Sequence, residues 1–262
     1  MAKDSQFKAY DLHRKKQHAI SSPLANITRH RLNPADWADA EAVAGKPARK
    51  VAKKRAAKTK KRATKKAVRT ATDILHCWSA EIECLHCGKL GDDPNCESKC
   101  YDRFRKDHSI RHLIDVKGPS HLGYGAFTRP GVQLSKGQWL DEYLGELKPL
   151  AGDTGETSAS LYRCEIPGIC AVDAEQAGNW TRFINSHCRP NVKLWGEFVG
   201  KRHVILFQAL RDIGPEEEIV FNYGSWYFER AGFKCVCDAY KRPHIPGGEH
   251  RAKKPVRCSK AG

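Results

Sequence analysis

Two stretches of the sequence decide the fold: Gly178-Asn179-Trp180-Thr181-Arg182-Phe183-Ile184-Asn185-Ser186-His187-Cys188-Arg189-Pro190-Asn191 and, further along the chain, Glu217-Glu218-Ile219-Val220-Phe221-Asn222-Tyr223-Gly224. In the first stretch, polar residues that form strands poorly stand directly beside Phe183 and Ile184, and Pro190 excludes a regular helix. Such a conflict between local sequence and regular structure is typical of a functional site.

The two stretches resemble the signature motifs of SET-domain protein lysine methyltransferases, RFxNHSCxPN and E(E/L)xxFDYG. Residues 122–127 are similar to the GxG segment of that family, and Tyr143-Leu144-Gly145-Glu146 matches its YxGE segment. The four motifs follow in the family order, and the resemblance spans about residues 108–237. It implies a mainly β SET-domain fold of several small antiparallel sheets with few short helices, flanked by zinc-binding segments. It also implies a methyltransferase that uses S-adenosyl-L-methionine to modify lysines, here on histone tails.

Strand-like runs separated by Gly and Pro independently indicate small, mainly antiparallel sheets. We expect strands within residues 110–116, 138–144, 161–166 and 203–210, and a surface loop at 152–160.

The resemblance implies a set of cofactor-binding residues: Gly123, Tyr124, Gly125, Arg182, Phe183, Asn185, Ser186, His187 and Tyr223. Glycines at 123 and 125 let the backbone approach a ligand closely. The amide of Asn185 offers a donor and an acceptor, which suit an adenine edge. The family has Asn-His-Ser-Cys where this chain has Asn185-Ser186-His187-Cys188, so the middle two residues are exchanged. Either the backbone adjusts so that His187 reaches the adenine, or Ser186 takes its place.

Tyr223 occupies the position of the catalytic tyrosine of the family, and Tyr162 a position similar to its channel aromatics. The resemblance therefore implies that Tyr223 and Tyr162 are catalytic residues and that Tyr162, Phe221 and Tyr223 line the lysine channel. A phenylalanine at position 221 leaves room in such a channel, which permits products beyond monomethyl-lysine.

The first metal candidate is a set of four closely spaced cysteines, Cys84, Cys87, Cys96 and Cys100. Two close pairs can supply four thiolates to a structural zinc ion with little loop-closure cost. His76, Cys77 and His86 stand nearby as substitutes.

The second metal candidate joins Cys188 to Cys235 and Cys237. In the family, a post-SET CxCxxxxC segment adds three thiolates to the SET cysteine around one zinc ion. The third of those cysteines is missing here, because position 242 is Arg242. His244, His250 and Cys258 remain as candidates, and we favour Cys258, which keeps an all-thiolate site.

The net charge of +16 is concentrated in the N-terminal part of the chain. Residues 1–72 hold 20 Lys and Arg against 5 Asp and Glu, and residues 46–70 hold 13 basic residues and no acidic one. Self-repulsion and the lack of large apolar residues predict disorder there. Such a run indicates nuclear localisation and non-specific DNA binding through phosphate contacts, with a solubilising linker as the alternative.

The eleven cysteines occur without a signal peptide or an apolar run of 18 residues, which indicates a reducing intracellular compartment and no membrane partner. We divide the chain into a disordered basic arm (1–72), a zinc-binding segment (73–107), a SET domain (108–229) and a degenerate post-SET segment (230–262). The leading hypothesis is a nuclear, chromatin-associated histone lysine methyltransferase. The alternatives are a SET-fold chromatin-binding module without useful catalysis and a zinc-containing nucleic-acid binder.

Overall fold

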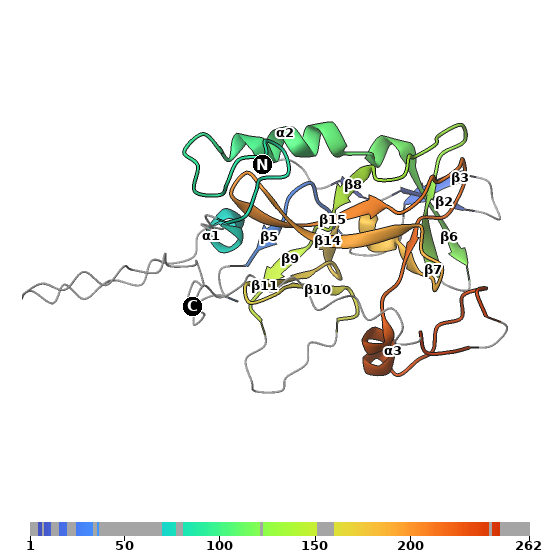
Figure 1. Cartoon of the computed structure of the whole chain (residues 1–262). Helices are drawn as coiled ribbons and strands as arrows, with labels where there is room; N and C mark the ends of the chain where they lie inside the picture. The colour runs from blue at the N-terminus through green and yellow to red at the C-terminus, as the bar shows by residue number, and fades with distance from the viewer. Residues whose placement is uncertain are drawn as a thin grey trace, which may run out of the picture.

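The computed structural model describes residues 5–6, 8–11, 16–19, 25–33, 36, 70–76, 81–120, 123–150, 160–240 and 243–246. Within these ranges the chain is mainly β with few helices, which confirms the predicted fold class (Figure 1). The α-helices are α1 (Ala71–Leu75), α2 (Lys99–His108) and α3 (Ser225–Ala231), and the 3-10 helices are η2 (Arg111–Leu113) and η3 (Trp180–Phe183).

The strands of the described residues are β1 (Ser5–Gln6), β2 (Lys8–Asp11), β3 (Lys16–Ala19), β4 (Ala25–Asn26), β5 (Arg31–Leu32), β6 (Ile114–Ser120), β7 (Gly123–Thr128), β8 (Trp139–Glu142), β9 (Glu146–Lys148), β10 (Arg163–Ile166), β11 (Cys170–Asp173), β12 (Ala177–Gly178), β13 (Asn185–Ser186), β14 (Val192–Val199), β15 (Arg202–Ala209) and β16 (Val220–Phe221). They form five small sheets, in the orders β1-β4-β12, β10-β11-β9-β5, β13-β16, β14-β15-β8 and β3-β2-β6-β7. Most pairs are antiparallel, as expected, but β4–β12, β13–β16, β2–β6 and β5–β9 are parallel.

Each predicted strand run overlaps a strand, with shifted limits. The largest shift is in the run 110–116, where η2 precedes the strand and β6 begins at Ile114. The Arg111 side chain donates a hydrogen bond to the Ile114 carbonyl oxygen at 2.7 Å, which closes this turn. Of the predicted loop 152–160, residues 152–159 lie outside the described residues.

Part of the N-terminal segment differs from the expected disordered arm. Strand β4 pairs with β12, and β5 pairs with β9, so residues 25–33 belong to the folded domain. Ile27 is 4% exposed and packs with Leu144 and Ala177, which anchors this segment to the domain. The composition of residues 1–72, taken together, does not reveal this short apolar contact. Residues 37–69 lie outside the described residues, and with them most of the basic run.

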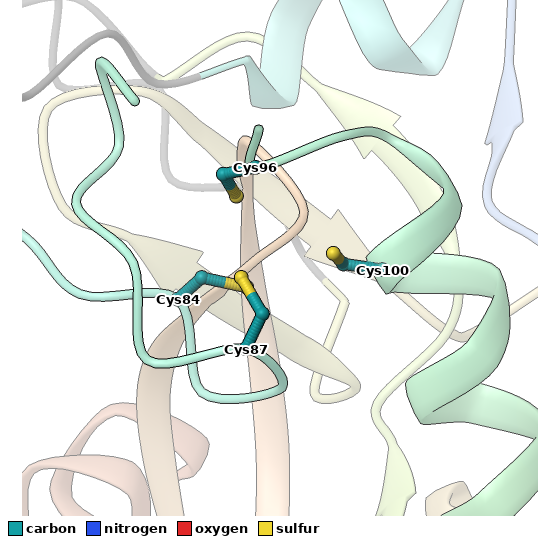
Figure 2. A group of neighbouring side chains, drawn as sticks. All are labelled: Cys84, Cys87, Cys96 and Cys100. Atoms are coloured by element: carbon teal, nitrogen blue, oxygen red, sulfur yellow. The ribbon is translucent and has the colours of Figure 1, made fainter. Parts of the chain in front are cut away.

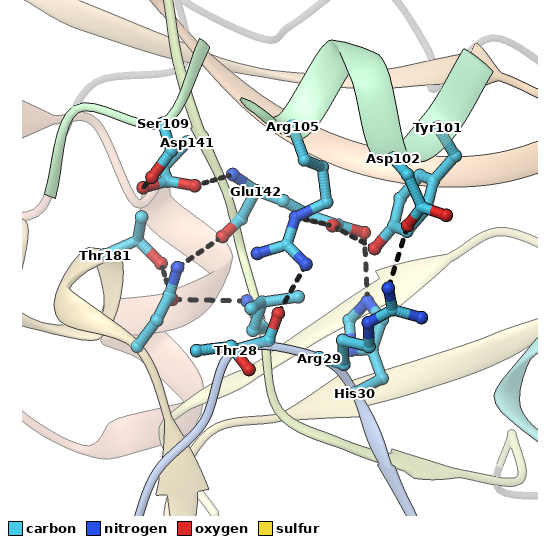
Figure 3. Close-up of polar contacts among 12 residues, drawn as sticks. Thr28, Arg29, His30, Tyr101, Asp102, Arg105, Ser109, Asp141, Glu142 and Thr181 are labelled. Carbon is cyan, nitrogen blue, oxygen red and sulfur yellow. Dashed lines mark hydrogen bonds and ion pairs between the residues drawn. The ribbon is translucent and has the colours of Figure 1, made fainter. Parts of the chain in front are cut away.

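A buried carboxylate fixes the N-terminal segment to α2 and β8 (Figure 3). Glu142, whose side chain is 1% exposed, accepts a hydrogen bond from the Tyr101 hydroxyl at 2.7 Å and lies 3.2 Å from His30 Nε2. Arg105 Nε is 3.5 Å from the same carboxylate, and its guanidinium also donates to the Thr28 carbonyl oxygen. Burial raises the pKa of Glu142, but His30, Arg105 and Tyr101 outweigh burial and hold it below its usual value.

The same corner of the fold supports the first signature stretch. Asn179 donates to the Glu142 backbone carbonyl at 2.8 Å, and the Trp180 indole donates to Asp141 Oδ2 at 2.8 Å. Trp180 is fully buried in the main core. The N-terminal segment is therefore linked, through β8, to the start of the stretch that carries Arg182.

No helix among the described residues is long and apolar enough to span a membrane.

Candidate cofactor pocket and metal centres

The four cysteines of the first metal candidate converge, as their spacing predicts (Figure 2). The sulfur atoms of Cys84, Cys87, Cys96 and Cys100 all lie within 4.8 Å of one another, and all four thiols are free. Zinc–sulfur bonds of about 2.3 Å in a tetrahedron place sulfurs about 3.8 Å apart, so the group needs little movement to hold zinc. His86, a predicted substitute, is not part of this group, and Cys77 lies outside the described residues.

The group is attached to the end of β14 and to the turn between β14 and β15. The Gly200 backbone N–H donates to Cys84 Sγ at 3.2 Å, and the Leu85 N–H donates to the Phe198 carbonyl oxygen at 2.8 Å. Burial raises the pKa of Cys84, but N–H donors, Gly200 foremost, outweigh it and lower the pKa below the usual value. Cys84 is thus prepared to act as a thiolate ligand.

The second metal candidate assembles with His244 as its fourth member. The ligand atoms of Cys188, Cys235, Cys237 and His244 lie within 4.8 Å of one another, and His244 Nε2 is 3.0 Å from Cys188 Sγ. Two backbone hydrogen bonds between Cys235 and His244, of 2.8 and 3.0 Å, bring the imidazole back to the thiols.

From sequence we favoured Cys258 as the fourth ligand of this group, and that preference stays a prediction. The four described residues would suffice for a tetrahedral ion, which takes four ligands. Cys258 and the other candidate, His250, lie outside the described residues.

The GxG segment lies against the first signature stretch. Asn185 Nδ2 donates to the Tyr124 carbonyl oxygen at 3.2 Å and to Glu218 Oε1 at 2.8 Å. Both amide hydrogens are therefore directed at protein acceptors, and the side chain can offer a ligand its carbonyl oxygen. This differs from the expected donor and acceptor pair: the carbonyl oxygen suits an amino or ammonium group instead.

The two glycines of this segment serve different purposes. Gly123 has φ +82°, a backbone conformation that favours glycine. A Cβ at Gly125 would lie 2.5 Å from Glu218 Oε1 and 2.9 Å from the Phe127 ring. Gly125 thus makes room for the Glu218 carboxylate that holds Asn185.

Arg182 and Phe183 lie beside Tyr124 and Tyr162, at the end of η3. The Arg182 guanidinium stands 4.3 Å over the Tyr162 ring and 5.2 Å over the Phe183 ring, and Phe183 meets Tyr124 edge to face at 6.1 Å. Burial lowers the pKa of Arg182. Tyr162, Arg182, Phe183 and Tyr124 therefore form a continuous series of contacts.

Tyr223 lies in a group of aromatic rings. Its ring centroid is 4.6 Å from those of Phe221 and Tyr227, and its hydroxyl donates to the Ile184 carbonyl oxygen at 2.7 Å. Burial raises the pKa of Tyr223 far above its usual value, so the hydroxyl keeps its proton.

Two tyrosines near this group were not assigned a role from sequence. Tyr227 touches Tyr223, and the buried Tyr143 donates its hydroxyl hydrogen to the Tyr162 carbonyl oxygen at 2.7 Å. Burial raises the pKa of Tyr143, and Cys164 and Tyr223 nearby raise it further. Tyr143 could have been found, because it is the tyrosine of the YxGE segment.

Ser186 and His187, the two residues exchanged relative to the family motif, contact different parts of the protein. Ser186 Oγ lies 3.4 Å from the Tyr223 backbone nitrogen, next to the aromatic group. His187 Nε2 is 2.7 Å from Asp238 Oδ1, and its Nδ1 is 3.0 Å from the Arg189 backbone nitrogen. Both ring nitrogens of His187 thus meet protein partners, which does not fit an adenine contact by this ring.

Comparison with known proteins gives a match to the SET domain family model over residues 55–224. Among curated proteins, the chain is 31% identical over 153 residues to the Variant-silencing SET domain-containing protein of Plasmodium falciparum, covering 54% of this chain and 6% of that protein. It is 28% identical over 166 residues to Histone-lysine N-methyltransferase ASHR3 of Arabidopsis thaliana, covering 60% of this chain and 31% of that protein. The chain thus spans less than a third of the length of either relative.

Among solved structures, KRYPTONITE in complex with mCHH DNA, an H3(1–15) peptide and SAH matches with a TM-score of 0.36 and 23% identity, over 42% of this chain and 23% of that one.

Proposed function

Because the chain belongs to the SET-domain family, we propose that it is an S-adenosyl-L-methionine-dependent protein lysine methyltransferase that acts on histone tails. The observation that carries this proposal is the position of Tyr223, in an aromatic group that adjoins Ser186 and the Asn185–Glu218 pair. Relatives named as histone-lysine methyltransferases support the substrate class.

The residues of the pocket fit the cofactor. When bound, S-adenosyl-L-methionine would supply a methyl group on a sulfonium. The Asn185 carbonyl oxygen can accept a hydrogen bond from its ammonium or amino group, and Gly123 leaves the backbone open to it. Arg182, Phe183 and Tyr124 would form the apolar and cationic side of the same pocket.

Tyr223 suits the transfer step because its hydroxyl is neutral and oriented. Lysine has a reference pKa near 10.4, so only about 1 in 250 amines is neutral at pH 8. A dry aromatic channel lowers that pKa, whereas a carboxylate in contact would raise it. Since the Tyr223 hydroxyl donates to the Ile184 carbonyl, its oxygen can accept an N–H of the neutral amine and leave the nitrogen lone pair free to attack.

The channel residues support a product beyond monomethyl-lysine. We place Phe221, Tyr162 and Tyr223 in the channel and add Tyr143 and Tyr227, which contact them. Phe221 packs edge to face on Phe207 at 5.2 Å and brings no hydroxyl that could hold a water molecule there.

We assign two structural zinc ions to the two ligand groups. Cys84, Cys87, Cys96 and Cys100 would bind one, and Cys188, Cys235, Cys237 and His244 the other. Four ligands in each group leave no open position, which fits a structural and not a catalytic role.

The basic run 46–70 supports nuclear localisation and non-specific binding to nucleosomal DNA.

The proposal is tested by incubating the protein with radiolabelled S-adenosyl-L-methionine and whole nucleosomes, and then locating the label. We expect label on a histone, and its loss in Tyr223→Phe while cofactor affinity stays within a few-fold. A fully active Tyr223→Phe would refute the role of this hydroxyl. Cofactor binding without transfer to any nucleosomal protein would instead favour the chromatin-binding module.

A further inference from the structure

His187 connects the first signature stretch to the candidate C-terminal metal-binding segment, which we call the cap (residues 233–240 and 243–246). His187 precedes the ligand Cys188, and its partner Asp238 follows the ligand Cys237. The hydrogen bond between them, 2.7 Å from Nε2 to Oδ1, spans 51 residues of sequence. It therefore ties together the two chain segments that supply the thiols of the second metal group.

The hydrogen-bond partners fix the direction of this contact. A carboxylate only accepts, so His187 Nε2 carries the hydrogen and donates to Asp238. On the other side of the ring, Nδ1 lies 3.0 Å from the Arg189 backbone nitrogen and 3.1 Å from the Arg189 carbonyl oxygen, and in the neutral ring it accepts from the Arg189 N–H. The imidazole is thus held from both sides, and its side chain is 21% exposed against 95% for Asp238.

The cap also packs on the residues that adjoin the lysine channel. Cys235 and Cys237 form a buried cluster with Phe228, and Tyr223 and Tyr227 pack against it. A displacement of the cap would change the surroundings of Tyr223 before it changed the Asn185–Glu218 pair, of which Asn185 lies on β13 and Glu218 two residues before β16.

We propose that His187 is a positioning residue for the cap: through Asp238 it retains the second metal ion and places the wall of the lysine channel, and it makes no contact with the cofactor. The effect on the lysine peptide rests on the proposed function, whereas the effect on metal retention does not. The exchange of Ser186 and His187 then has a structural purpose. The serine stays at the backbone of Tyr223, and the histidine reaches the cap.

The experiment compares His187→Ala, Asp238→Ala and the double variant, with His112→Ala and Asp92→Ala as exposed controls. Zinc-loaded protein is mixed with a chromogenic chelator, and the release of the two ions is followed over time. Because one hydrogen bond to an exposed carboxylate contributes little, we expect either single variant to release one of the two ions about two- to fivefold faster. The double variant should be no faster than the singles, since both changes remove the same contact.

Two further readouts separate positioning from a general loss of structure. Titration with S-adenosyl-L-methionine should give an unchanged affinity for His187→Ala, and kinetics with a histone peptide should show a raised KM at nearly unchanged kcat. His187→Gln, which keeps a donor in reach of Asp238, should restore part of the retention.

Unchanged zinc release in both single variants would overturn the proposal. It would also be overturned if the unaltered protein, after loading with zinc, held only one ion per chain. A loss of cofactor affinity in His187→Ala with normal zinc release would return His187 to the cofactor pocket. If the unaltered protein transfers no methyl group, the proposed function fails, but the chelator experiment still decides the role of His187.

Discussion

Replacing His30 by Ala should destabilise the whole domain, although His30 lies far from Tyr223 in sequence. The substitution removes one of three partners of Glu142, whose side chain is 1% exposed. A buried charge that loses its partner costs about 3–5 kcal/mol, and a hydrogen bond to a charged group contributes about 1.5–3 kcal/mol. Because Tyr101 and Arg105 remain, we expect a loss of about 2–3 kcal/mol in the free energy of unfolding. At about 2–4 °C per kcal/mol, Tm should fall by about 4–12 °C.

The assay is chemical and thermal unfolding followed by circular dichroism, with His112→Ala as an exposed control. In a Glu142→Gln background the same substitution should cost less, because no buried charge is left behind. A loss below about 0.5 kcal/mol for His30→Ala, the size of an ordinary surface substitution, would refute the anchoring of the N-terminal segment by this pair.

The pH dependence of stability follows from the direction in which the pKa of Glu142 is shifted. Its folded-state pKa lies below its usual value, so its contribution to stability is fully present above the unfolded pKa of about 4.3. That contribution is lost as the pH falls through the folded-state pKa. The difference between the original protein and His30→Ala should therefore be largest near neutral pH and shrink below about pH 4.

Three other changes give equally definite expectations. Gly125→Ala places a Cβ 2.5 Å from Glu218 Oε1, so the cofactor affinity measured by calorimetry should fall about tenfold or more. The control Gly196→Ala, where a Cβ meets open space, should leave the affinity unchanged. Equal affinities for the two variants would show that the Glu218 carboxylate moves freely. Cys84→Ser should reduce zinc from two ions to one per chain by mass spectrometry of the folded protein, and two retained ions would contradict the ligand assignment. Deleting residues 46–70 should weaken nucleosome binding and flatten its dependence on salt, whereas an unchanged salt slope would identify the run as a linker.

The sequence predicted the fold class because its motifs are local and ordered. Cys84, Cys87, Cys96 and Cys100 lie within seventeen residues, so spacing alone sufficed to predict their convergence. The limits of the strands were less predictable, since η2 and β6 share one apolar run.

Long-range partners were beyond the reach of sequence patterns. His30 and Glu142 are 112 residues apart, and no local pattern pairs residues at such a separation. The approach of His244 to the thiols of the second metal group depends on its backbone pairing with Cys235, which composition does not encode. The direction of His187 depended on a single residue of register, because successive side chains of a strand point to opposite faces.

The hydrogen bond from Gly200 to Cys84 has a consequence for how this protein acquires its metal. A Cβ at Gly200 would lie 2.6 Å from the Tyr101 backbone nitrogen, so the turn between β14 and β15 fits tightly against the start of α2. The Cys84 sulfur accepts a hydrogen bond from the Gly200 N–H, which lies 116 residues away in the chain. A peptide of residues 81–108 would lack that donor and should bind zinc more weakly than the intact chain. We therefore expect the four cysteines to reach full zinc affinity only once this hairpin has formed.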